Sequence, residues 1–425
     1  MGRGPDHRAV TSLAAREAAL HILGAVPRQP TLRIPLDDAL GSVLAEAVVS
    51  PLDLPPWTNS AMDGYAARAE DVRGATDDNP IRLRVIEQIP AGHFPTQTLN
   101  AGECARIFTG APLPSGADSV IRQEDTDLGC DSVVIRSDRD AGVNIRLAGE
   151  DIRKGTTVLE AGTELGAAEL GVLASLAVAH PLVFRRPLVG ILGGGDEIVD
   201  VDQPEAILSG RKIASSNSHT LHALVRLAGG EPLNLGIAGD TPESVRTHLT
   251  RATECDLLVT TAGISVGEHD HLRDVVTTLG GSIDFWKLRM RPGAPVGFGQ
   301  LLGIPWIGLP GNPVSAMVTF ELFVRPAIRT MAGHPLPFRR STPVRMAEAI
   351  SLRPTLQHFL RAIVSETPSG PEARLTGPQG SGILTSMVHA NALLVVDEGR
   401  HETRIGDTVP AILLQDPVHT RTPGF

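Results

Sequence analysis

Between residues 186 and 335, short apolar runs alternate with patterns typical of helices. Three of these runs are too short for helices and rich in strand-forming residues, so they predict buried strands. The runs cover residues 188–192, 233–237 and 255–261. Helical patterns follow them, beginning near Ser216, Pro242 and Leu272. This alternation predicts a mostly parallel sheet that binds ligands at the carboxyl ends of its strands.

The segments on either side of this region follow a different pattern. One helical pattern covers residues 11–24, and another covers residues 167–176. Short strand patterns separated by glycine and proline predict one small β domain in the first half of the chain and another at its end. These strands cover residues 81–86, 103–108, 119–123 and 132–135, and then 343–347, 358–364, 392–396 and 407–414.

Together these patterns predict a multidomain fold of α/β and β domains. Residues 1–50 and 140–185 form an extended helical and strand region, into which a small β domain of residues 51–139 is inserted. A central α/β domain of residues 186–335 follows, and residues 336–425 form a C-terminal β domain. A chain of 425 residues is long enough for several domains that each bury a core.

The amino-acid composition indicates a globular protein and argues against one that binds nucleic acid. Charged residues make up 20% and hydrophobic residues 42% of the chain, which is typical of globular proteins. A net charge of -10, with aromatic residues at only 3%, argues against nucleic acid as a partner. The 3 cysteines include no C-x-x-C pair, which is typical of a protein in a reducing cytosol.

The apolar stretches do not indicate a targeting or membrane segment. The N-terminal residues lack the apolar core of a signal peptide. The most apolar stretch, residues 170–184, is broken by His180 and Pro181 and is too short to span a bilayer. We therefore expect a cytoplasmic protein without a membrane partner.

Polar side chains follow the predicted strands of the central domain. These residues are Asp196, Glu197, Asp240 and Asp270, with Asn312 at a later turn. Asn312 is placed to cap a helix whose first turn contains Pro313. Because the carboxyl ends of parallel strands meet at one edge of a sheet, we expect these residues around a single ligand-binding mouth.

Two features of the same region indicate an anionic ligand. The order of strand, glycine loop and helix over residues 255–279 is a geometry that presents unpaired N–H groups to negative charge. Further on, Lys287, Arg289 and Arg291 alternate, so they would lie on one face of a strand. Carboxylates with a divalent ion between them, and cations opposite, would hold a phosphate.

Two further motifs leave other chemistry open. The sequence Gly263-Ile264-Ser265-Val266-Gly267 matches the G-x-S-x-G nucleophile elbow of hydrolases, for which Asp284 and His334 could complete a triad. Acids and histidines are common in a chain of this size, so this motif alone is weak evidence. His269 and His271 could bind a metal, but two histidines at this spacing diverge on a helix, which favours a solvated loop.

A series of motifs along the chain resembles the molybdopterin molybdenumtransferase family, to which MoeA and the gephyrin E domain belong. The motifs stand in the family's order and occur in every region. They are WTNSAMDGYA at residues 57–66, TGAP at 109–112, GEDI at 149–152, GDE at 195–197, SVGEHD at 265–270 and GLPGNPVS at 308–315.

The resemblance implies a fold, a reaction and a set of partners. It implies an elongated homodimer of four-domain subunits, with residues 1–50 and 140–185 as the dimerisation domain and the active site in a cleft between subunits. It also implies Mg2+-dependent cleavage of adenylylated molybdopterin, in which molybdate is inserted and AMP is released. Molybdopterin adenylyltransferase and molybdoenzymes, or their chaperones, would be the partners.

Carried over by position, the resemblance implies roles for individual residues. The catalytic residues would be Asp151, Glu197, Asp270 and Lys287, and the metal ligands Asp240 and Asp270. The residues that bind the cofactor precursor would be Gly195, Asp196, Asp240, Ser265, Gly267, Arg291, Pro310, Asn312, Pro313 and Ser315.

The chain departs from the family's usual pattern at four polar positions. Thr58 stands in place of an acid, Arg291 and Ala294 in place of two lysines, and Leu356 in place of an arginine. The structural glycines and prolines remain. These departures leave two functions open, a transferase for molybdate or tungstate, and a paralogue that keeps the pterin pocket as a carrier, scaffold or regulator.

Overall fold

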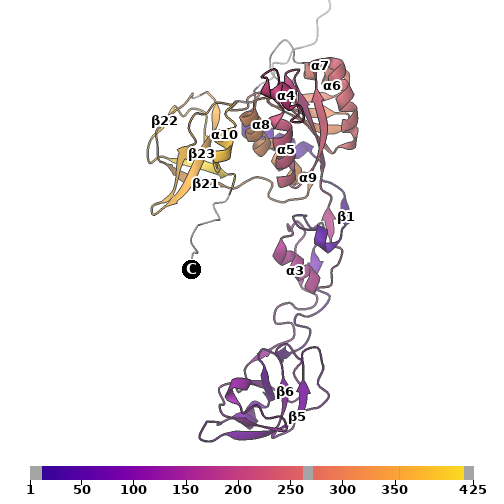
Figure 1. Cartoon of the computed structure of the whole chain (residues 1–425), viewed down its shortest axis with the longest axis vertical. Helices are drawn as coiled ribbons and strands as arrows, with labels where there is room; N and C mark the ends of the chain where they lie inside the picture. Colours follow the sequence, from indigo (N-terminus) through magenta and orange to yellow (C-terminus); the bar gives the residue numbers. More distant parts are fainter. Residues whose placement is uncertain (1–11, 262–270, 354, 416–425) are drawn as a thin grey trace, which may run out of the picture. The chain divides into compact units, whose positions relative to one another are not determined.

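The computed structural model describes residues 12–261, 271–353 and 355–415. The chain divides into two compact units, shown in Figure 1. One unit comprises residues 1–45, 162–166 and 180–425, and the other comprises residues 46–161 and 167–179. This division is coarser than the four domains expected from the sequence, whose individual boundaries stay predictions.

The central part of the first unit is a six-stranded sheet in the order β15-β12-β16-β20-β19-β17. Its strands are β12 (Leu188–Gly194), β15 (Glu231–Ala238), β16 (Leu257–Thr261), β17 (Ser282–Phe285), β19 (Gly297–Leu301) and β20 (Ile304–Leu309). The pairings from β15 through β20 are parallel, whereas β19 pairs antiparallel with both of its neighbours. The mostly parallel sheet expected from the sequence is therefore confirmed.

Helices cover this sheet on two faces, each with its own apolar core. The helices are α1 (Ala15–Ala25), α4 (Pro204–Leu208), α5 (Ser216–Leu227), α6 (Pro242–Leu249), α7 (His271–Thr278), α8 (Pro313–Thr319) and α9 (Arg325–Met331), with a π-helical segment (Phe320–Val324) joining α8 to α9. On one face α1, α5, α8 and α9 pack with Val259 and Ile307, and on the other α6 and α7 pack with Leu258 and Trp306. The alternation follows from the two-residue period of a strand.

A closed β barrel forms the C-terminal part of the same unit (Figure 1). Its strands are β21 (Ser341–Met346), β23 (Gln357–Thr367), β24 (Gly370–Leu375), β25 (Ala392–Val396) and β27 (Thr408–Leu413). The sheet order ends on β25, and β25 also pairs with β23, which closes the ring. The sequence pattern misses β24, because a glycine, a proline and two charged residues make it a poor strand former outside this tertiary context.

The second unit is built around a five-stranded sheet in the order β7-β4-β6-β5-β8. Its strands are β4 (Gly64–Ala67), β5 (Ile81–Ile89), β6 (Glu103–Ile107), β7 (Ser119–Arg122) and β8 (Ser132–Ile135). Four of them were expected from the apolar pattern, and β4 overlaps the end of the WTNSAMDGYA motif. This unit also contains α2 (Ala69–Val72) and α3 (Ala167–Ser175).

Short elements complete both units. They are β1 (Thr31–Arg33), β2 (Val48–Val49), β3 (Asn59–Ser60), β9 (Ile145–Arg146), β10 (Thr157–Leu159), β11 (Leu182–Phe184), β13 (Ile198–Val199), β14 (Ile213–Ala214), β18 (Met290–Arg291), β22 (Ile350–Ser351), β26 (Glu402–Thr403) and α10 (Thr385–His389). Within the described residues, no helix is both long and apolar enough to cross a membrane.

Candidate active site

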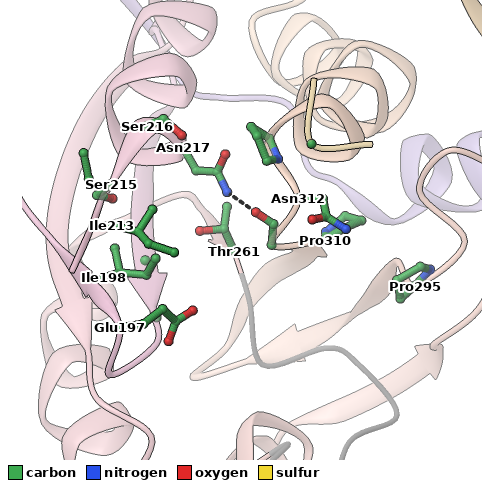
Figure 2. A pocket seen from close by; sticks show the side chains of 16 residues that line it. Glu197, Ile198, Ile213, Ser215, Ser216, Asn217, Thr261, Pro295, Pro310 and Asn312 are labelled. Atoms are coloured by element: carbon green, nitrogen blue, oxygen red, sulfur yellow. Dashed lines mark hydrogen bonds between the residues drawn. The ribbon is translucent and has the colours of Figure 1, made fainter. Parts of the chain in front are cut away.

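A pocket of about 590 Å3 lies where three neighbouring parallel strands end. Gly193 and Gly194 end β12, Thr261 ends β16, and Pro310 follows β20. The first residues of α5 and α8 complete the wall, so we call this cavity the α5–α8 pocket (Figure 2). It is lined by Gly193, Gly194, Glu197, Ile198, Ile213, Ala214, Ser215, Ser216, Asn217, Thr261, Pro295, Pro310, Gly311, Asn312, Pro313 and Gly382.

One hydrogen bond connects the two helix starts across the pocket. The Asn217 side chain, in the first turn of α5, donates its Nδ2 hydrogen to the Gly311 carbonyl at 2.7 Å (Figure 2). Ser215, which precedes α5, makes no side-chain capping bond to the helix, and its hydroxyl contacts that of Ser218 at 2.6 Å. The amide groups of the first turn of α5 therefore remain available to an anion.

The turn before α8 behaves differently from the prediction in one respect. Asn312 occupies the capping position and Pro313 the first helical position, as expected, but the Asn312 side chain makes no capping hydrogen bond. The Val314 amide instead donates to the Ser381 carbonyl at 3.1 Å, and Pro313 has no amide hydrogen to cap. A segment of the C-terminal barrel thus takes over the capping role and leaves the Asn312 side chain at the pocket.

Glycines at the end of β12 bring the Glu197 side chain to the pocket. Gly195 has a φ of +123°, a conformation that side chains disfavour, and a Cβ there would lie 2.7 Å from Glu197 Oε2. The Glu197 carbonyl accepts a hydrogen bond from the Ile213 amide at 2.9 Å, which attaches this turn to β14. The backbone conformation of the turn therefore favours glycine at this position, and a side chain there would displace the Glu197 carboxylate.

Asp196 and Asp240 are held together beside a second cavity. The Asp240 amide donates to Asp196 Oδ1 at 2.9 Å, and the Asp196 amide donates to Asp240 Oδ2 at 3.2 Å. Gly195 and Asp196 line this neighbouring cavity of about 400 Å3, together with Asp200. A hydrogen bond from His219 lowers the pKa of the Asp200 carboxyl below its ordinary value. Two of the acids expected at the mouth are thus adjacent: Asp196 precedes Glu197 after β12, and Asp240 follows the neighbouring strand β15.

The predicted row of three cations on one strand is wrong. Strand β17 ends at Phe285 and β18 begins at Met290, and between them the Leu288 amide donates to the Ala294 carbonyl at 2.8 Å, so the chain folds back. Arg289 pairs with Glu398 at 3.1 Å and also donates to the Ser12 carbonyl. Lys287 and Arg291 are exposed, and neither lines the α5–α8 pocket.

The structure places the other expected site residues in three groups. Glu197, Pro310, Asn312 and Pro313 line the α5–α8 pocket, whereas Ser315 is buried in the first turn of α8, away from its lining. Asp151 belongs to the second unit, where it is exposed and its amide donates to the Leu54 carbonyl at 3.0 Å. Ser265, Gly267 and Asp270 lie outside the described residues, as do the G-x-S-x-G and His269–His271 motifs apart from the backbone of His271.

Several pocket residues were not anticipated as ligand contacts. Ser216 and Asn217 appeared in the sequence only as a helix start, and in the structure they follow the short strand β14. Ile213 and Gly382 gave no signal, because their place at the pocket depends on how distant segments pack. No cluster of three or more His, Cys, Asp or Glu side chains suited to a metal occurs among the described residues.

Comparison with known proteins agrees with this architecture. Three family models match successive parts of the chain: the MoeA N-terminal region (domains I and II) at residues 13–177, a probable molybdopterin-binding domain at residues 190–330, and the MoeA C-terminal region (domain IV) at residues 343–414. The α5–α8 pocket draws most of its lining from the second of these ranges.

Relatives match over nearly the whole chain. A molybdopterin molybdenumtransferase of Nostoc is 36% identical over 97% of this chain and 96% of its own length. A molybdopterin molybdenumtransferase 2 of Mycobacterium tuberculosis is 39% identical over 88% of this chain and 93% of its own. A crystal structure of a MoeA protein from Pyrococcus horikoshii superimposes with a TM-score of 0.79 at 31% identity, covering 95% of this chain and 100% of that one. The chain therefore belongs to the molybdopterin molybdenumtransferase (MoeA) family.

Proposed function

We propose that this protein is a molybdopterin molybdenumtransferase of molybdenum cofactor biosynthesis. It inserts molybdate into adenylylated molybdopterin in a Mg2+-dependent reaction that releases AMP. The observation that supports this function best is the α5–α8 pocket, which two helix starts and a Pro-Gly-Asn-Pro turn form at the carboxyl ends of parallel strands. Names of the relatives, and the model for a molybdopterin-binding domain, point to the same substrate class.

The pocket would recognise its substrate mainly through backbone groups. The amides at the start of α5 suit the phosphate oxygens of an adenylylated pterin, because a helix N-terminus favours negative charge. Asn217 acts as a positioning residue, since its bond to Gly311 fixes the Pro310–Pro313 turn relative to α5. Glu197 is the acid at the pocket wall, where it would accept a proton or a hydrogen bond from the substrate.

The nearby acids are chemically suited to Mg2+. This ion takes oxygen ligands and is commonly held by one or two carboxylates together with substrate phosphates. Asp240 offers such a carboxylate, of which Oδ2 accepts the Asp196 amide, and we propose that Asp240 and Asp270 hold the ion. When bound, Mg2+ neutralises charge on the phosphates that separate during cleavage.

The second function, a carrier or scaffold that binds the pterin without cleaving it, is favoured by one observation. Ala294 has replaced the family's lysine directly before Pro295, which lines the pocket, so a cation is missing next to the substrate. At Thr58 the loss is milder, because its hydroxyl still accepts the Ala148 amide at 3.3 Å. Leu356 has replaced an arginine in the C-terminal barrel.

The assembly and cellular partners also belong to this proposal. We propose a cytoplasmic homodimer in which Asp151 and Lys287 contribute to catalysis. A molybdopterin adenylyltransferase would supply the substrate, and molybdoenzymes or their chaperones would receive the product. Sedimentation of the purified protein tests the dimer, because a monomer at micromolar concentration would contradict it.

The activity itself is tested by AMP release from adenylylated molybdopterin. We expect the purified protein to release AMP when Mg2+ is present and to do so faster when molybdate, or tungstate, is added. Pterin binding without AMP release under any of these conditions would contradict the transferase and support the carrier.

A further inference from the structure

A separate cavity with a positively charged lining lies in the same unit and shares no residue with the α5–α8 pocket. It measures about 490 Å3 and is lined by Arg325, Arg339, Arg340, Thr342 and Leu413. Arg325 begins α9, Arg339 and Arg340 precede β21, Thr342 lies in β21, and Leu413 ends β27. We call it the arginine cavity. The arginine cavity lies between α9, the last helix of the α/β domain, and strands β21 and β27 of the C-terminal barrel.

Negative charge at the arginine cavity is insufficient for its three guanidinium groups. Glu321 pairs with Arg339 at 2.7 Å and lies 3.9 Å from Arg325. Arg325 donates a further hydrogen bond to the Pro337 carbonyl at 3.1 Å. Arg340 forms no ion pair or side-chain hydrogen bond with any residue that the structure describes. The Glu321 carboxylate therefore pairs with two of the three arginines and leaves the third, Arg340, without a described partner.

This imbalance has an electrostatic effect on the buried member of the group. The Arg325 side chain is only 13% exposed. Burial, and after it repulsion by Arg339, lowers the pKa of Arg325 to about 10, and Glu321 compensates only in part. An anion in the cavity would reduce this repulsion, because Glu321 and Glu164 only partly offset the positive charge around Arg325.

We propose that the arginine cavity binds a tetrahedral oxyanion, either inorganic phosphate or the phosphate group of a small monoester. Guanidinium groups match such an anion in geometry as well as charge, since their planar forks donate paired hydrogen bonds to phosphate oxygens. Thr342 adds a hydroxyl to the lining. The site lies outside the pocket assigned to the pterin and goes beyond the proposed transferase function.

Calorimetric titration with inorganic phosphate, and separately with glycerol 3-phosphate, tests the site. The Arg340 side chain is exposed, and its guanidinium has no described partner. Arg340→Gln therefore removes one positive charge from the cavity and should leave the fold unaffected. Arg404→Gln is the matched control, because Arg404 is 79% exposed in the same barrel and does not line the cavity. The α5–α8 pocket is unchanged in all three proteins, so any phosphate bound there is common to them.

We expect Arg340→Gln to weaken phosphate binding about tenfold at one site per chain, as the loss of a charge-assisted hydrogen bond implies. Arg404→Gln should remain within about twofold of the wild type. Tighter binding of one ligand over the other tells whether free phosphate or an ester is preferred. Identical titrations of wild type and Arg340→Gln with both ligands, for proteins with the same unfolding midpoint in phosphate-free buffer, would overturn the proposal.

Discussion

The α5–α8 pocket and the arginine cavity would bind anions through different groups. Glycine, proline, serine and asparagine make up most of the pocket lining, and among the described residues its one charged side chain is an acid, Glu197. The arginine cavity is lined by three cations. In the first, negative charge would be met by backbone amides at helix starts, and in the second by side chains.

Because the binding groups differ, the two sites should respond differently to substitution of a single residue. A pocket built on backbone groups depends on turns and on the residues that hold them, so we expect binding there to be sensitive to loss of a positioning residue such as Asn217. A site built on side chains should lose affinity when a single arginine changes, as proposed for Arg340.

The strongest test concerns a cation that supports the backbone wall of the pocket. Arg361 is fully buried, and its guanidinium donates to the Pro378, Gln379 and Gly380 carbonyls and to the Ser386 hydroxyl. The loop that follows supplies the Ser381 carbonyl, which accepts the Val314 amide, and Gly382, which lines the pocket.

Arg361→Ala removes the donors to three loop carbonyls and to the buried Ser386 hydroxyl and empties a fully buried side-chain position, so we expect the free energy of unfolding to fall by about 3–5 kcal/mol. Urea denaturation measures this change. The exposed Arg374, on β24, is the control, and Arg374→Ala should shift the free energy by less than about 0.5 kcal/mol. Equal effects of the two substitutions would show that Arg361 does not hold the loop.

A second prediction concerns His334, whose pKa is lowered by burial and by the positive charges of Arg329 and Arg325. This side chain is buried next to Glu164, with Nδ1 at 3.3 Å from its carboxylate. Burial, and after it repulsion by Arg329, lowers the pKa of His334 to about 4. Arg325 of the arginine cavity acts in the same direction.

The sign of the resulting pH effect follows from linkage. In the unfolded chain the pKa of a histidine is about 6.5. Between this pH and about 4, the unfolded state therefore binds a proton that the folded state does not bind. The stability due to His334 is therefore complete above pH 6.5 and is lost as the pH falls through about 4, by up to about 3 kcal/mol. His334→Gln should flatten the dependence of unfolding free energy on pH in this window. If the slope of unfolding free energy against pH were the same in His334→Gln as in the wild type, the pH dependence would not be due to His334.

The smallest expected effect on stability is at Asn217, whose single hydrogen bond crosses the pocket. Asn217→Ala should lower the free energy of unfolding by only about 1 kcal/mol. It should nevertheless weaken binding of molybdopterin about tenfold, because the Pro310–Pro313 turn is no longer fixed to α5. Asn79→Ala, at an exposed turn of the second unit, is the control for both measurements. Unchanged pterin binding in Asn217→Ala would contradict the positioning role.

Much of the fold could be predicted from local sequence, and the reasons are physical. The strands of the α/β domain are apolar on both faces, so β12 and β16 appear as continuous apolar runs. The Asn312-Pro313 helix start follows from the stereochemistry of proline. Strand β24 and the fold-back after Leu288 could not be predicted, because both depend on pairing with distant segments.

The candidate site was predictable in part for the same reason. Asp196, Glu197 and the Pro310–Pro313 turn follow strands whose carboxyl ends meet, so topology alone brought them to one edge of the sheet. The contribution of Gly382 depends on the packing of the barrel. The arginine cavity draws on residues as far apart as Arg325 and Leu413, and no local pattern connects them.

The proposed function requires that adenylylated molybdopterin is cleaved at the α5–α8 pocket. The most direct test compares molybdate-dependent AMP release by the wild type, Glu197→Gln and Glu205→Gln. Glu205 is an exposed acid of α4 outside the pocket lining, so its substitution makes the same chemical change elsewhere in the domain. We predict that Glu197→Gln slows AMP release about 100-fold while Glu205→Gln does not. Equal rates for all three proteins would show that the reaction takes place without this pocket's acid and would contradict the account.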